Sequence, residues 1–64
     1  MSSAEFVEGY RDGRDPNAPE PSANRSHAYR HSFAVGRAEL AKKPIPAAVS
    51  RERAAEAEQM DRDQ

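Results

Sequence analysis

Two histidines are the residues of this chain best suited to metal chemistry. His27 and His31 are four residues apart, a spacing that places two imidazoles on one face of a helix, where they can share a metal ion. A zinc site needs three or four protein ligands, and neither an HExxH pattern nor a further ligand at helical spacing accompanies the pair. We therefore expect two solvent-facing histidines, no metal and no cofactor.

The sequence contains no pattern typical of a catalytic site. Ser26 lies beside His27, and Ser32 beside His31, but neighbours in sequence do not have the geometry of a nucleophile, a base and an acid. The two glycines of residues 9–13 are not a phosphate loop, because no strand precedes them and no Gly-Lys-Ser/Thr follows. We expect a protein that is not an enzyme and has no small-molecule substrate.

Charge is distributed unevenly along the chain. The 64 residues carry a formal net charge of −1, yet residues 25–43 hold five basic side chains and one acidic side chain. Both flanking segments are net negative, so only this middle segment is suited to meeting a polyanion. The candidate RNA-contacting residues are its five basic ones: Arg25, Arg30, Arg37, Lys42 and Lys43.

These arginines also have a purely structural interpretation. Arg30 and Arg37 are seven residues apart, on one side of a helix, and can pair with Glu8 and Asp12 of a neighbouring helix, or remain solvated. Arginines exposed along one continuous edge of the fold would favour RNA. Guanidinium groups held against acidic side chains would favour internal pairing.

Large apolar side chains are scarce, which limits the core. Leu, Ile, Val and Phe together number seven among 64 residues, so we expect one small domain of marginal stability. Its four aromatic rings are then needed for packing rather than for stacking on bases. The chain has no Cys to form a disulfide, no signal-peptide pattern at its start and no stretch long enough to span a bilayer, so we expect a cytoplasmic protein.

One short pattern occurs twice. Residues 6–14 (FVEGYRDGR) and 29–37 (YRHSFAVGR) both read aromatic, two residues, small, aromatic, two residues, Gly, Arg, with an offset of 23. In each copy the rings and the small residues fall at i, i+3, i+4 and i+7, on one helix face. A glycine inside a helix costs about 1 kcal/mol relative to Ala, and close approach of another backbone would compensate. We interpret the repeat as a packing device in which two such faces interlock, with the rings of one helix over the small residues of the other.

Signals for helix starts and ends place the first two elements. Ser2 and Glu5 form a capping box that predicts a helix over about 4–14, and three prolines make 15–23 an extended connector. A second helix is predicted over about 24–42.

The start of that second helix can be capped by Ser22 or Asn24, and Pro44 stops it. Residues 1–43 should then form an antiparallel helical hairpin.

The last segment, 44–64, is rich in Ala and Glu and predicts a third helix over about 46–58, with Pro46 at its first position. Its apolar face is thin, with Ile45 and Val49 as the main contributors. We expect a loosely packed helix that frays into a disordered tail. The predicted fold class is all-α.

The residues of the repeat also carry a family resemblance. Gly9-Tyr10-x2-Gly13-Arg14, a short turn-rich connector and then Tyr29-x2-Ser32-Phe33 resemble the bacterial ribosome modulation factor family, over about residues 9–40. The resemblance implies a small non-catalytic helical hairpin that binds ribosomal RNA on the small subunit and helps to silence ribosomes. Arg25 and Arg30 would be the RNA contacts to test.

Two functional hypotheses follow. The first is a protein-interaction module or small adaptor that completes its thin core on a partner protein or on a second copy of itself. The alternative is a ribosome-associated regulator that contacts RNA through the basic second helix.

Overall fold

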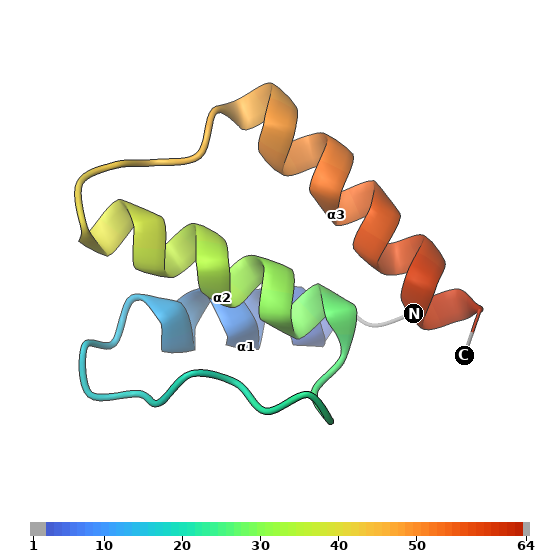
Figure 1. Ribbon diagram of the computed structural model, residues 1–64, viewed down its shortest axis with the longest axis horizontal. Coiled ribbons are helices and arrows are strands. Elements are labelled where there is room, and N and C mark those ends of the chain that lie inside the picture. Colours follow the sequence, from blue (N-terminus) through green and yellow to red (C-terminus); the bar gives the residue numbers. More distant parts are fainter. Residues whose placement is uncertain (1–2, 64) are drawn as a thin grey trace.

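Three helices make up the fold in the computed structural model, which describes residues 3–63: α1 (Ser3–Gly13), α2 (His27–Leu40) and α3 (Ala47–Arg62) (Figure 1). No strand occurs between residues 3 and 63. Helices α1 and α2 pack closely, whereas α3 is more loosely placed and packs on α2. The predicted all-α class, with a close pair of helices and a looser third, is confirmed.

The direction of the close pair differs from the prediction, because α1 and α2 run parallel rather than antiparallel. Their contacts advance together along both helices: Glu5 accepts a hydrogen bond from Ser26, and Gly9 and Gly13 lie against the backbones of Tyr29 and Phe33. The connector passes back along the pair before α2 begins (Figure 1).

The connector explains this direction. Its thirteen residues, 14–26, lie outside the helices and include three prolines. An extended chain covers about 3 Å per residue, and the eleven residues of α1 rise only about 16 Å. The connector is therefore long enough to return the chain to the N-terminal end of α1, so that α2 runs in the same direction as α1.

The start of α2 is set by Ser26, not by Ser22 or Asn24 as predicted. The Ser26 hydroxyl accepts a hydrogen bond from the Tyr29 N–H at 3.0 Å and donates one to Glu5 of α1 at 2.8 Å. The Ser22 hydroxyl instead accepts from the Asn24 N–H, at 3.3 Å, within the connector. The Ser2 cap predicted for the first helix lies outside the described residues.

Helix α2 ends in a Schellman-type turn. The Lys43 N–H donates to the Ala38 carbonyl at 2.9 Å and the Lys42 N–H donates to the Glu39 carbonyl at 3.0 Å, as this motif requires. Lys42 has a φ of 62°, the left-handed conformation that Gly usually supplies at this position.

Helix α3 extends to Arg62, four residues beyond the predicted end at residue 58. Pro46 is its N-cap rather than its first helical residue. Only Ala57 of α3 is buried. Among residues 3–63, the other buried residues that carry a side chain are on α2, namely Ala28, Tyr29, Ser32 and Phe33.

Candidate binding surface

The contact between α1 and α2 is a backbone contact made at glycines. A Cβ atom added to Gly9 would overlap the carbonyl oxygen of Tyr29 and stand 3.0 Å from its Cα. An added Cβ at Gly13 would likewise overlap the carbonyl of Phe33, and both glycines are buried. The glycines are therefore present for fit, and the interpretation of the repeat as a packing device is confirmed.

The two copies of the repeat make reciprocal contacts. Gly13 lies against the carbonyl of Phe33, and Gly36 lies against the carbonyl of Tyr10. In the repeat, Gly13 corresponds to Gly36 and Tyr10 corresponds to Phe33, so the two contacts are one contact made twice. The pair thus has an approximate two-fold relation. Peptide carbonyls, rather than the expected rings, fill the space above the glycines.

Arg25, a candidate RNA contact, lies against α1. Its guanidinium carbon is 3.6 Å from the centroid of the Tyr29 ring, and a guanidinium nitrogen is 3.8 Å from Glu5 and 3.7 Å from Glu8. A cation over an aromatic face between two carboxylates is electrostatically satisfied. The Tyr29 hydroxyl donates in turn to Asp12, whose carboxylate raises the pKa of Tyr29.

Arg37 holds the connector. Its guanidinium donates hydrogen bonds to the carbonyls of Asp15, at 3.1 Å, and Ala18, at 2.7 Å, and lies 4.7 Å from the centroid of the Phe33 ring. The connector is thereby tied to α2. Arg37 therefore does not make the pairing with Glu8 or Asp12 that the sequence suggested for it and for Arg30. Arg25 is the arginine that lies against Glu8.

Arg30 differs from these two arginines. Its Nε is buried and has no hydrogen-bond partner among the described residues, and no ion pair to its guanidinium is found there. Leaving a buried donor unsatisfied costs about 1–3 kcal/mol. An arginine in this state is the side chain of α2 best prepared to accept an anionic partner.

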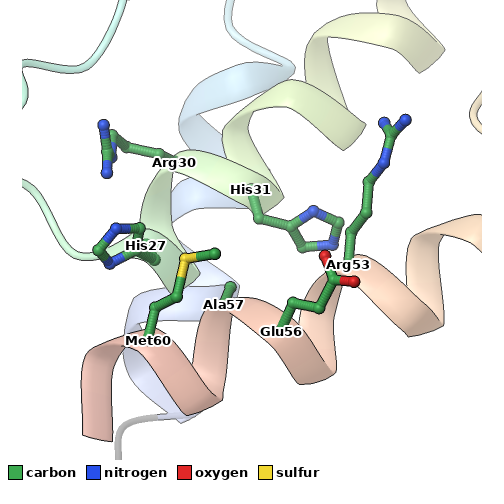
Figure 2. Close-up of a pocket in the computed structure, with 7 residues that line it drawn as sticks. All are labelled: His27, Arg30, His31, Arg53, Glu56, Ala57 and Met60. Carbon is green, nitrogen blue, oxygen red and sulfur yellow. The ribbon is translucent and has the colours of Figure 1, made fainter. Parts of the chain in front are cut away.

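Two hollows meet at Arg30. The first, of about 280 Å³, lies between α2 and α3 (Figure 2). The second, of about 520 Å³, lies between α2 and the connector. The first hollow is lined by His27, Arg30 and His31 from α2 and by Arg53, Glu56, Ala57 and Met60 from α3. The second is lined chiefly by Glu20, Pro21, Arg30, Ala34, Arg37 and Ala38.

We call the surface formed by the two hollows and Arg30 the trough. Its floor is the face of α2 that carries Arg30, Ala34, Arg37 and Ala38, which we call the third face because α1 and α3 pack on the other two. Its sides are α3 and the connector, which flank α2 in Figure 1. Lys42 and Lys43 are exposed beyond the end of α2, outside both hollows. The structure therefore brings Arg30 and Arg37 together, but not all five predicted residues.

His27 is occupied by a contact with α3, although the sequence predicted a solvent-facing side chain. Asp61 accepts hydrogen bonds from the backbone N–H groups of His27, at 2.7 Å, and Ala28, at 2.9 Å. The His27 Nδ1 is also 2.9 Å from the Asp61 carboxylate. A carboxylate at the N-terminus of another helix satisfies its free N–H groups and its dipole.

The electrostatics of Asp61 reflect this role as a cap. Partial burial acts to raise the pKa of its carboxyl, but the N–H groups of Ala28 and His27 and the His27 imidazole outweigh that effect and lower the pKa. The sequence analysis did not identify Asp61. No signal was available, because the third helix was predicted to end at about residue 58, which left Asp61 in the fraying tail.

His31 also faces α3 rather than solvent. It lines the first hollow, where burial lowers its pKa and the positive charge of Arg53 lowers it further, while a backbone hydrogen bond with Ser50 acts in the opposite direction. Between residues 3 and 63, no three His, Cys, Asp or Glu side chains are placed to hold a metal ion.

Comparisons with known proteins give no relatives: no family model matches the chain, and no curated protein and no solved structure was found to be similar to it. Within residues 3–63, every helix is too short or too polar to cross a membrane.

Proposed function

We propose that this chain is a non-catalytic protein-interaction module, a small adaptor whose trough receives a partner protein. The observation that carries the proposal is the state of the third face of α2. This face is flanked by two hollows, and the guanidinium group of Arg30 at its centre has no acceptor among residues 3–63.

The contacts that Arg25 and Arg37 make within the fold favour this proposal over RNA binding. Arg25 is placed between Glu5 and Glu8, and Arg37 is hydrogen-bonded to the connector. The carboxylates offset the charge of Arg25, and the hydrogen bonds of Arg37 occupy donors that a phosphate would need. Polyanion affinity depends on the number of phosphates neutralised.

The distribution of apolar side chains supports it further. Val7 and Met60 are 62% and 49% exposed, and Tyr10 and Leu40 also reach the surface. In a chain with so few large apolar residues, leaving several outside the core favours a protein that completes its burial on a partner.

Site-specific photo-crosslinking in living cells tests the proposal. A benzophenone amino acid at position 34, on the floor of the trough, should give a protein adduct whose partner is identified by mass spectrometry. The matched control carries the same group at Ala48, which is exposed on α3 outside both hollows. Equal adduct formation at the two positions, or none at position 34, would contradict the proposal.

A second candidate function is a ribosome-associated regulator in the cytoplasm. It is favoured by the resemblance of residues 9–40 to the ribosome modulation factor family and by the exposed Lys42 and Lys43, which have no ion-pair partner among residues 3–63. Co-sedimentation with small ribosomal subunits tests this candidate. Salt-sensitive binding that weakens when both lysines are replaced by Gln, or when Arg25 or Arg30 is replaced, would favour it, and no binding at low salt would exclude it.

A further inference from the structure

We infer that the trough binds an amphipathic helix of a partner protein that presents one carboxylate to Arg30. The inference rests on the proposed interaction function and specifies the chemistry of the partner. Three features of the trough carry it: the guanidinium group of Arg30, the small side chains of the floor and the balance of charge along the two sides.

Arg30 supplies the polar contact. The Nε of Arg30 is buried and has no acceptor between residues 3 and 63, so the chain itself covers this atom, and the terminal nitrogens of the guanidinium group are the donors left for a partner. The guanidinium group presents its N–H groups as a planar fork that fits a carboxylate with two parallel hydrogen bonds. Because Arg30 lines both hollows, a carboxylate placed there would sit at the middle of the trough.

The floor of the trough fits a helix. Ala34 and Ala38 are one helical turn apart on the third face of α2, so their short side chains let a second helix approach closely. Pro21 on the connector side and Met60 on the α3 side provide apolar walls. Met60 is flexible and half exposed, and such a side chain adapts readily to a partner surface.

The charges at the sides distinguish one carboxylate from a nucleic acid. Glu20 lies on the connector side with Arg37, and Glu56 lies on the α3 side with Arg53. With Arg30 the trough holds three arginines and two glutamates, a balance of one positive charge that matches a single carboxylate. A phosphate backbone carries a charge on every nucleotide and would meet both glutamates with like charge. A helix with a single central acid meets Arg30 and leaves the glutamates at the solvated rims.

Peptide selection tests this inference. A phage library of 16-residue helical peptides, panned against the immobilised full chain, should enrich peptides with one Asp or Glu flanked by apolar residues at i±3 and i±4. Replacing Arg30 by Gln should weaken binding of the enriched peptide about tenfold or more, since a charge-assisted hydrogen bond is lost. Arg30→Lys, which keeps the charge but loses the fork, should also weaken it.

The control variant is Arg53→Gln, which removes a positive charge from the side of the first hollow and should change affinity less than threefold. Thermal unfolding of each variant verifies that the fold is retained. No enrichment, enriched peptides without an acid, or equal binding by parent and Arg30→Gln overturns the inference. Arg30-dependent binding of an 18-nucleotide single-stranded RNA that is tighter than any selected peptide also overturns it. Binding that ignores Arg30 but maps elsewhere on the chain leaves the interaction function standing and removes only this assignment.

Discussion

The two interfaces of α2 are opposite in kind. Towards α1, α2 meets another backbone directly, with glycines on both helices and no room for a methyl group. Towards α3, it meets side chains around a hollow of about 280 Å³, and Ala57 is the one buried residue of α3. The first interface is fixed by steric fit. The second is held by polar contacts near both ends of α3, since Asp61 caps the start of α2 and the Ser50 backbone hydrogen-bonds His31.

This difference shows which of the two interfaces can rearrange when a partner binds. A close-packed backbone contact has no alternative arrangement at similar energy, so α1 and α2 form a rigid pair. A helix that buries one small side chain and is otherwise held by a few polar contacts can shift with little loss of apolar contact. The trough therefore has one rigid boundary, α2, and one adjustable boundary, α3, which suits the binding of a partner helix.

The largest expected effect comes from filling the close interface. Gly13→Ala should lower the free energy of unfolding by roughly 2–3 kcal/mol, because the overlap with the Phe33 carbonyl outweighs a helix-propensity gain of about 1 kcal/mol. Urea unfolding followed by circular dichroism measures it. Arg11→Ala, an exposed change in the same helix, should stay within about 0.5 kcal/mol. A Gly13→Ala protein as stable as its parent would contradict the backbone contact.

The next effect concerns the loose interface. Asp61→Ala should cost about 1–2 kcal/mol, because two N–H groups at the start of α2 lose their cap. Amide hydrogen exchange should show faster exchange at His27, at Ala28 and throughout α3, with the C-terminal half of α1 still protected. Asp63→Ala, two residues further on and exposed, is the control. Loss of protection in α1 equal to that in α3 would show that the two interfaces are not independent.

A smaller effect, a gain in stability, is expected in the turn that ends α2. Lys42→Gly should raise the free energy of unfolding by about 0.5–1 kcal/mol, since Gly relieves the left-handed conformation at a φ of 62°. Lys43→Gly should not stabilise, because Lys43 has no positive φ. Thermal melts of both variants measure the difference, and equal shifts would contradict the turn geometry.

The smallest effect is a pH dependence located at the loose interface. The pKa of His31 lies below its ordinary value in the fold, so the unfolded chain binds the proton more readily. Its contribution to stability is therefore complete above about pH 6.5 and is lost as pH falls below that value. Lowering the pH from 7.5 to 5.5 should decrease the melting temperature of the parent more than that of His31→Gln. An equal decrease in the two proteins would exclude His31 as the titrating group. The pKa of Asp61 is also lowered in the fold, so its contribution to stability is likewise lost as pH falls, in this case below about pH 4.

Much of the fold could be predicted, because the signals were local. The repeat places its small residues on one face of each helix, and the glycines are where the backbones meet. Proline and the Ala/Glu-rich composition located the connector and the third helix. The surface was less predictable: of the five basic residues chosen from the sequence, Arg25 and Arg37 are engaged within the fold and Arg30 is not.

By itself, the sequence determined which residues share a helix face and which positions must lack a side chain, since helical periodicity and steric size are local properties. The tertiary structure alone decided that α1 and α2 run parallel, that Asp61 caps α2 and that Arg30 has no partner between residues 3 and 63. Each of these depends on groups that are distant in the chain, brought together by the reach of the connector and by the path of α3. Periodicity carries no information on either.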